Sequence, residues 1–235
     1  MTHYSDMGME FSNQQEHSKF LEDLCNDNIK GYSFLEDIKG GKFLHKELGN
    51  IVFNIMQIKK TLKIGFTYKN KNIVEGVVLS CKENPHDTYT LNVDINGIPF
   101  WFDCSNAVFF KVKKKKKVKF SSACFADYVE IWTKEELNKH REENEEELKM
   151  ADESYISDFN TDPTTAYILS GIITNFKKDK NPITDKEFWV IDISCLGLKT
   201  KLLVDTKEID EASIKKGSII RTRCFCTAII EEVLK

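Results

Sequence analysis

The sequence predicts a mainly β protein, α+β overall, in which two small barrel-like units follow one another in tandem along the chain. An N-terminal α/β head precedes the first unit, and a charged helix connects the two. The segment from Val74 to Ile131 resembles the segment from Leu169 to Glu232, and both alternate β-branched or aromatic runs with turn residues, as short strands do. Between them lies a stretch rich in Glu and Lys that contains no Gly or Pro, which is typical of an exposed helix.

The resemblance between the two segments rests on an ordered series of residues. Each contains a glycine in a β-branched run, an Asn-Pro pair, a strand that ends in Asp-Ile, a glycine turn, an Asp and a Cys-Phe pair. The matched positions are Gly76 and Gly171, Asn84-Pro85 and Asn181-Pro182, Asp94-Ile95 and Asp192-Ile193, Gly97 and Gly197, Asp103 and Asp205, and Cys124-Phe125 and Cys224-Phe225. Two β-rich stretches can match by coincidence, because strands draw on few residue types. The preserved order favours a structural duplication.

Each segment divides into four strands. We expect them at 73–81, 89–95, 99–103 and 117–131 in the first unit, and at 166–176, 187–193, 199–205 and 218–232 in the second. A short helix is expected only in the second unit, at Glu208 to Lys215. An oligonucleotide/oligosaccharide-binding (OB) barrel has this order if the long last strand bends and counts as two. The expected division is therefore 1–132 for the head and first barrel-like unit, 133–165 for the charged helix and linker, and 166–235 for the second, OB-like unit.

The head is expected to combine a helix with a pair of strands. Ser12 can cap a helix that begins near Asn13. The alternating runs at 51–58 and 62–68 predict two strands or a hairpin. The stretch from Gly31 to Gly49 contains turn glycines and only short apolar pieces. We expect the head to pack on the first unit.

The charged helix has its own start signal. Thr133 and Glu136 form a capping box, and the sequence stays compatible with a mostly exposed helix to Glu153. Asp162-Pro163 then marks a linker. Such a helix is a solvated spacer, or it folds over a basic segment as a counter-charge, or it offers an acidic surface to a partner.

Composition is typical of a globular protein of one large or two small domains. The 235 residues are 41% hydrophobic and 30% charged, with a formal net charge of −3. The chain has no apolar run long enough for a membrane helix, and its first residues do not resemble a secretory signal, so we expect a cytoplasmic protein. Seven scattered cysteines favour reduced, buried thiols. Cys224 and Cys226 point to one sheet face, but without a second paired motif we expect no metal site.

The chain contains no phosphate loop, dinucleotide fingerprint, nucleophile elbow or metalloprotease helix, and its five histidines are isolated. We therefore expect no enzyme and no cofactor. An enzyme whose site assembles from dispersed residues is the weakest of the three functional hypotheses.

A lysine run at Lys111 to Lys119 carries the most specific hypothesis. Such a run can neutralise phosphates, and nearby aromatic rings can stack on bases, so one reading is single-stranded nucleic-acid binding. The candidate residues are Lys113, Lys114, Lys115, Lys116, Lys117 and Lys119, with Trp101, Phe109 and Trp189 as stacking rings. The competing reading is a solvated edge or loop that prevents aggregation, with the aromatics in the core.

Two segments, Thr2 to Phe11 and Met150 to Ile156, together with the strand-rich C-terminal region, resemble an uncharacterised family of bacterial cytoplasmic proteins with a C-terminal OB-like domain. The lysine run departs from that family's pattern. The resemblance transfers no catalytic residue and implies a non-enzymatic role, in conflict or toxin-neutralisation systems. The leading hypothesis is therefore a binding protein whose ligand is another protein, contacted through strand edges or barrel faces.

Overall fold

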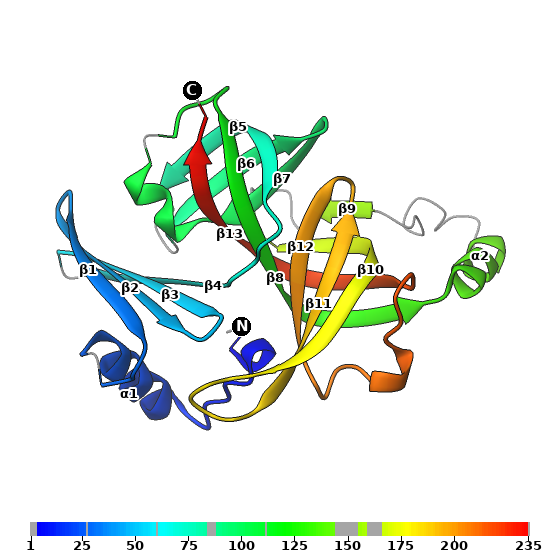
Figure 1. Cartoon of the computed structure of the whole chain (residues 1–235), viewed down its shortest axis with the longest axis horizontal. Helices are drawn as coiled ribbons and strands as arrows, with labels where there is room; N and C mark the ends of the chain where they lie inside the picture. The colour runs from blue at the N-terminus through cyan, green and yellow to red at the C-terminus, as the bar shows by residue number, and fades with distance from the viewer. Residues whose placement is uncertain are drawn as a thin grey trace.

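Strands dominate the computed structural model, which confirms the mainly β class (Figure 1). The structure describes residues 4–26, 28–59, 61–83, 88–110, 112–143, 155–158 and 166–234. The strands form a four-stranded sheet and a nine-stranded sheet. No helix in these ranges is long and apolar enough to cross a membrane.

The four-stranded sheet is an antiparallel meander in the head. Its strands are β1 (Tyr32–Ile38), β2 (Gly41–Leu48), β3 (Ile51–Ile58) and β4 (Thr61–Tyr68), paired in that order. The predicted hairpin at 51–58 and 62–68 is confirmed. The sequence does not predict β1 and β2, because polar and charged residues interrupt the alternation of apolar ones between Gly31 and Gly49.

A short 3-10 turn, η1 (Ser5–Met7), and helix α1 (Gln14–Cys25) precede the sheet. The expected cap is wrong by one residue: Asn13 is the N-cap, and its side chain accepts hydrogen bonds from the amides of Gln15 and Glu16. The Ser12 amide instead donates to the Glu16 carboxylate at 2.8 Å. Asn is at least as good a cap as Ser, which explains the shift.

The nine-stranded sheet contains all eight strands predicted for the two units. Their bounds are β5 (Val74–Glu83), β6 (Tyr89–Ile95), β7 (Ile98–Asp103), β8 (Lys117–Trp132), β10 (Ala166–Lys180), β11 (Glu187–Cys195), β12 (Leu198–Asp205) and β13 (Ile219–Val233). A ninth strand, β9 (Tyr155–Asp158), pairs with β10 at one edge.

The two long strands β8 and β13 belong to both halves of this sheet. They pair antiparallel along nearly their whole length, from Ile219 opposite Trp132 to Val233 opposite Val118. One circuit of pairings runs β5–β6–β7–β13–β8 and returns to β5, and the other runs β10–β11–β12–β8–β13 and returns to β10. Figure 1 shows β8 and β13 passing from the β5–β7 hairpins to the β10–β12 strands.

Each long strand therefore closes against the first strand of its own segment and then crosses to the other segment. The start of β8 is antiparallel to β5, and its middle is parallel to β12, with Leu202 beside Cys124. In the same way the start of β13 is antiparallel to β10, and its later part is parallel to β7, with Thr227 beside Asp103.

Local details of the two segments also correspond. The β5–β6 ladder has a bulge between Val78 and Ser80, and the β10–β11 ladder has one between Ile173 and Asn175. Gly76 and Gly171 occupy matched places in β5 and β10, where a Cβ would meet the neighbouring strand at less than 3.0 Å. Only glycine fits there without displacing that strand.

The turns correspond as well. The two-residue hairpins at Asn96-Gly97 and Leu196-Gly197 all have positive φ, as a type I′ turn requires. The correspondence extends to the turn before each long strand, where Lys115 and Gly217 both have positive φ.

The expectation of a helix only in the second unit is wrong. The first segment carries the longer 3-10 helix, η2 (Ser105–Phe109), and the second only η4 (Glu211–Ser213). The Ser105 to Phe109 stretch lacks a helical apolar period and was therefore not recognised.

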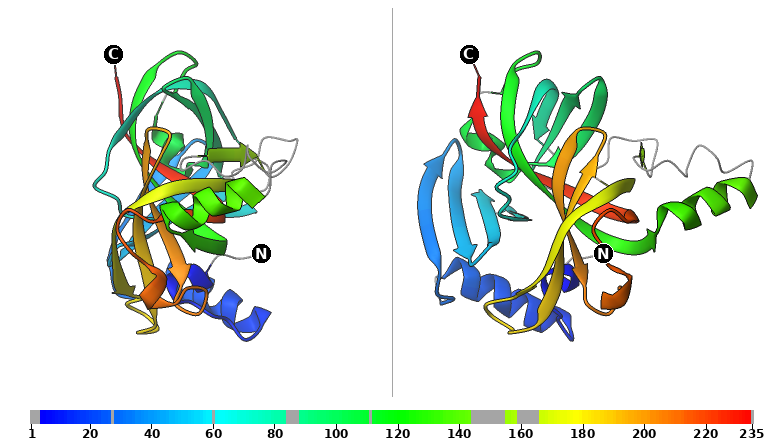
Figure 2. Two further views of the ribbon diagram at one scale, coloured as in Figure 1. Left: turned by 90° about the vertical axis from the view of Figure 1, so that its right-hand side faces the viewer. Right: turned by 45° about the vertical axis from the view of Figure 1, so that its right-hand side comes forward.

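The charged helix α2 spans Lys134–Glu143 and projects from the end of β8 (Figure 2). Its predicted capping box is confirmed: the Glu136 amide donates to Thr133 Oγ1 at 3.1 Å, and the Thr133 amide donates to the Glu136 carboxylate at 2.7 Å. The rest of the expected helix to Glu153, the Asp162-Pro163 linker and Asn84-Pro85 lie outside the described residues.

The head contacts both halves of the large sheet rather than the first unit alone. Asn54 donates to Ser105 Oγ at 2.6 Å beside the first circuit, while Asn181 donates to the Met7 carbonyl at 2.7 Å from the second. A hydrophobic cluster joins the head to both long strands and the second circuit; it includes Phe53, Phe125, Phe188 and Leu203. These contacts fix the head against the large sheet, and the outer strand β1 lies on the side of the head that faces away from that sheet (Figure 1).

Candidate functional site

The outer edge of the four-stranded sheet is the most exposed apolar feature of the described chain. Tyr32 and Leu35 on β1 have exposed fractions of 63% and 60%, the two highest among the exposed large hydrophobic residues. β1 pairs with β2 through an uninterrupted register from Tyr32 opposite Glu47 to Ile38 opposite Gly41. Within the described ranges no strand pairs with its other side. We call this strand and its exposed side chains the β1 edge.

A pocket opens beside the β1 edge on one face of the sheet. Its volume is about 180 Å³. Its lining is mostly apolar and comprises Cys25, Leu35, Lys42, Leu44, Ile55, Gln57 and Leu62. Leu35 and Leu62 are both well exposed at its rim, and Cys25 closes one end at the last residue of α1. A medium-sized apolar side chain from another molecule would fit this space.

The opposite face of the edge is aromatic. Phe34 stacks on His45 with ring centroids 4.8 Å apart, and Tyr32 lies 6.4 Å from both rings. His45 is held by Asn54, whose Oδ1 is 2.7 Å from its Nδ1, and by Glu47 at 3.2 Å. The edge therefore presents apolar groups on both faces of a strand whose neighbours are fixed.

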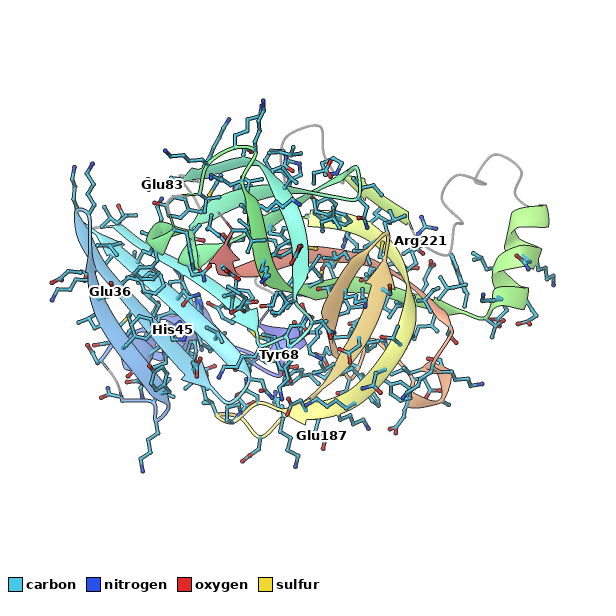
Figure 3. All side chains as sticks on the ribbon, turned by 45° about the horizontal axis from the view of Figure 1, so that its top comes forward. Glu36, His45, Tyr68, Glu83, Glu187 and Arg221 are labelled. Carbon is cyan, nitrogen blue, oxygen red and sulfur yellow. The ribbon has the colours of Figure 1, made fainter. Side chains whose placement is uncertain are left out.

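The two charged residues on β1 itself are both acidic. Glu36 and Asp37 are exposed at the C-terminal half of β1, and Figure 3 shows Glu36 at the outer border of the molecule, beyond His45. Because successive residues point to opposite faces, each face of the edge carries one carboxylate next to its apolar groups. Lys42 lies opposite Asp37 on β2, on the side away from the open edge.

The lysine run forms a tight exposed turn before β8. Lys113, Lys114, Lys115, Lys116 and Lys117 are all exposed, and we call them the lysine turn. The turn is bonded to β5, since the Lys115 amide donates to the Val78 carbonyl at 2.7 Å and the Val78 amide donates to the Lys116 carbonyl at 2.8 Å. Lys119 lies beyond the turn and pairs with Glu232 at 2.9 Å, while Lys111 lies outside the described residues.

The aromatic residues proposed for base stacking do not share one surface. Trp189 is 3% exposed in the second circuit, and the Lys178 ammonium lies 4.7 Å from the centroid of its ring. Trp101 is partly buried against the core. Phe109 is exposed, but its ring forms a T-shaped contact with that of Phe43, with the centroids 4.6 Å apart. Trp189 therefore has no free face for a base, which follows from its place on an inward-facing position of β11.

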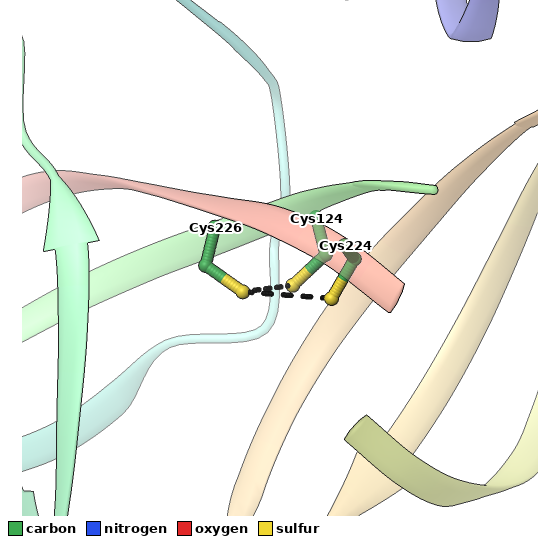
Figure 4. A group of neighbouring side chains, drawn as sticks. All are labelled: Cys124, Cys224 and Cys226. Atoms are coloured by element: carbon green, nitrogen blue, oxygen red, sulfur yellow. Dashed lines mark hydrogen bonds between the residues drawn. The ribbon is translucent and has the colours of Figure 1, made fainter. Parts of the chain in front are cut away.

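Sequence reasoning missed a cluster of three thiols. Cys124 of β8 lies beside Cys224 and Cys226 of β13, and the three sulfurs lie within 4.8 Å of one another (Figure 4). Hydrogen bonds from the Cys224 and Cys226 thiols lower the pKa of the Cys124 thiol, although burial opposes this. The hydrogen bond with Cys124 raises the pKa of Cys224, and burial raises the pKa of Cys226. The matched Cys-Phe pairs were the available signal, but the cross-strand register was not readable from sequence.

Comparison of the chain with protein-family models, curated proteins and solved structures finds no match.

Proposed function

We propose that this protein is a non-enzymatic binding protein that takes up an extended segment of a partner protein as an added strand beside β1. The observation that carries the proposal is the β1 edge: a regular, seven-residue strand with exposed Tyr32 and Leu35 and no bulge. Folded proteins usually protect such an edge with a bulge, a Pro, charged side chains or a covering element, because it pairs readily with another strand. β1 has no bulge or Pro, and its two charged residues, Glu36 and Asp37, lie only in its C-terminal half. An edge whose N-terminal half is apolar and uncharged favours strand addition as a function.

The side chains along the β1 edge indicate which kind of segment would bind there. Main-chain hydrogen bonds to β1 would supply affinity, and alternate side chains of the added strand would select the sequence. On one face an apolar side chain would lie beside Leu35 and reach the pocket of about 180 Å³. Farther along, Glu36 and Asp37 would favour a Lys or Arg on the partner. The expected ligand is therefore an extended segment with alternating apolar residues followed by a basic one.

Selection from a random peptide library on the full chain tests this proposal. Peptides with that pattern should be enriched, and their backbone should protect the amides of β1 from hydrogen exchange. Leu35→Lys should weaken the binding of the selected peptides by roughly tenfold or more, since it places a charge where an apolar contact is expected. Ile183→Lys is the matched control, because Ile183 is an exposed apolar residue in the β10–β11 hairpin and belongs neither to β1 nor to the pocket beside it.

Three results would overturn the proposal. One is the absence of any enriched pattern. Another is equal binding to the Leu35→Lys and Ile183→Lys variants. The third is a concentration-dependent dimer of the chain that Leu35→Lys abolishes, which would assign the β1 edge to a second copy instead of a partner.

The lysine turn favours a second candidate function, single-stranded nucleic-acid binding. Five consecutive exposed lysines on a hydrogen-bonded turn can contact several phosphates, and such binding weakens steeply with salt. Fluorescence anisotropy with single-stranded DNA and RNA at low salt tests it. Lys114→Glu with Lys116→Glu should abolish binding, and no binding of the wild-type chain at tens of micromolar would remove this candidate.

We further infer that the two segments are duplicated copies of one OB-like barrel. The matched bulges, hairpins and glycines support a common origin, and the order of the pairings around each circuit supports the OB-like description. In this view the long strand of each copy pairs first within its own barrel and then within the barrel of the other copy. A solved structure of the chain with unlike strand orders in the two circuits would contradict it.

A further inference from the structure

The thiol cluster lies at the crossing of the two long strands and is sealed from solvent. Cys124, Cys224 and Cys226 have exposed fractions of 0%, 1% and 1%. The sulfur of Cys226 is 3.0 Å from that of Cys124 and 3.8 Å from that of Cys224. Figure 4 shows the three side chains converging from β8 and β13 on one point. Sulfurs that share one metal ion lie about 4 Å apart when each metal–sulfur bond is about 2.3 Å. The sulfur of Cys224 is already near that separation from Cys226, whereas those of Cys124 and Cys226 would move apart on binding.

The register explains why three thiols meet. Cys226 pairs directly with Cys124, and Cys224 pairs with Ala126. Residues two apart in a strand point to the same face, so these four positions form a square on one face of the β8–β13 ladder. All four belong to the same hydrophobic core cluster. Three corners of the square carry sulfur, and the fourth carries the methyl group of Ala126, which is 3% exposed.

We propose that Cys124, Cys224 and Cys226 bind one thiophilic metal ion, with copper(I) as the preferred ion. Soft thiolate ligands select copper(I), zinc and iron–sulfur clusters. Structural zinc takes four ligands, usually Cys or His, and the square supplies three. The Thr200 hydroxyl lies 3.7 Å from Cys124 Sγ. A buried site with three sulfurs therefore favours copper(I) over zinc.

Burial determines how the ion would enter. With exposed fractions near zero, the sulfurs are not reachable in the folded chain, so loading would accompany folding and chelators would remove the ion slowly. Binding leaves the ion as copper(I) and releases to solvent one proton for each thiol that becomes a thiolate. No oxidant or reductant takes part.

The test begins with the wild-type chain, produced in bacteria with added copper or added zinc and purified without oxygen. Elemental analysis and native mass spectrometry should find about one copper ion per chain, because the three sulfurs form a single site. Cys124→Ser, Cys224→Ser and Cys226→Ser should each lower the affinity for copper by roughly tenfold or more, since losing even an outer partner of a ligand has an effect of that size, and the purified variants should retain little copper. Cys104→Ser is the matched control, because Cys104 is also fully buried but lies outside the cluster.

Ala126→Cys provides a test that gains a property. It places sulfur at the fourth corner, and the chain should then take up about one zinc ion, as a four-cysteine site does. Circular dichroism of each variant separates loss of the ion from loss of the fold, and the wild-type metal content stands even if a serine variant does not fold.

The alternative to a metal site is a bond between Cys124 and Cys226, which face each other across the ladder. Peptide mapping that finds this disulfide, with no metal bound under either growth condition, would overturn the proposal. Copper that remains after all three cysteines are replaced would overturn it too. One zinc ion per wild-type chain, lost in the three serine variants, would support the metal site and overturn the preference for copper.

Discussion

Phe125 of β8 and Phe225 of β13 pair directly across the ladder that joins the two segments. They are also the matched members of the two Cys-Phe pairs, so the point where the segments cross is the point where equivalent residues meet. Their side chains lie on the face opposite the thiol cluster, toward the head. Phe125 is fully buried, with its ring 4.9 Å from that of Phe66 on β4, whereas Phe225 is only partly buried. The head thus covers the crossing from outside.

Phe125→Ala should be one of the most destabilising substitutions in the chain. Removing a fully buried aromatic ring typically costs about 3–5 kcal/mol, and here the cavity would open between the head and both long strands. Phe225→Ala is the natural comparison and should cost clearly less, because part of its ring is already in contact with water. Urea unfolding followed by circular dichroism measures both. Equal losses would mean that the head does not pack on the crossing as described.

Lys115→Gly should stabilise the fold. Lys115 has a φ of 70°, and Gly217, which holds the same position in the turn before β13, has a φ of 85°. A non-glycine residue pays about 1–2 kcal/mol in the left-handed region, while glycine costs about 0.5–1 kcal/mol more entropy on folding. The expected net gain is about 0.5–1 kcal/mol by urea unfolding.

Lys114→Gly is the control for this turn, since Lys114 is not among the residues with positive φ. It removes the same charge without relieving backbone strain, and so should leave stability unchanged or lower it slightly. A stabilisation by Lys114→Gly as large as that by Lys115→Gly would attribute the gain to charge repulsion within the lysine turn.

The strands of the two units could be predicted because their signals are local. Alternating apolar runs, hairpin turns and glycines at bulged ladders each depend only on residues that are close together in sequence. The exchange of β8 and β13 between circuits has no such signal, because the partners Cys124 and Leu202, or Thr227 and Asp103, are far apart in sequence. The candidate sites could not be predicted for the same reason. The β1 edge depends on which strand is last in its sheet, and the thiol cluster depends on a cross-strand register.

Tyr68→Phe should loosen the head from the second circuit. The Tyr68 hydroxyl donates a hydrogen bond to Asp179 Oδ2, and the Asn50 amide donates to the same oxygen at 3.0 Å. Burial raises the pKa of Tyr68, and the bond to Asp179 raises it further. Burial alone would raise the pKa of Asp179, but these hydrogen bonds outweigh it and lower that pKa. A bond to a charged acceptor contributes about 1.5–3 kcal/mol, which is the loss expected on urea unfolding.

Tyr128→Phe is the control for Tyr68, because Tyr128 also donates to a carboxylate, that of Glu130, but is 50% exposed. Water replaces that bond readily, so the loss should stay below about 1 kcal/mol. If Tyr68→Phe costs no more than Tyr128→Phe, the contact with Asp179 does not hold the head in place.

Glu10 should make stability depend on pH at the contact between the N-terminal segment and the second circuit. Hydrogen bonds from Lys186, at 2.7 Å, and Lys207 lower the pKa of Glu10 to about 2. Because the folded pKa lies below the unfolded value of 4.5, the stabilisation is fully present above pH 4.5 and is lost as the pH falls toward about 2. The side chain is 40% exposed, so solvent screening limits its size to about 1 kcal/mol or less.

Glu10→Gln should therefore lower the free energy of unfolding at neutral pH, and the difference from the wild type should shrink as the pH falls below 4.5. Urea titrations at several pH values measure this, and added salt should reduce the difference, since exposed ion pairs are screened. Replacing both Lys186 and Lys207 with Gln should remove the same pH-dependent difference, because the carboxylate then has no cation to stabilise it. A difference that persists unchanged at low pH would show that Glu10 contributes through packing, and not through its charge.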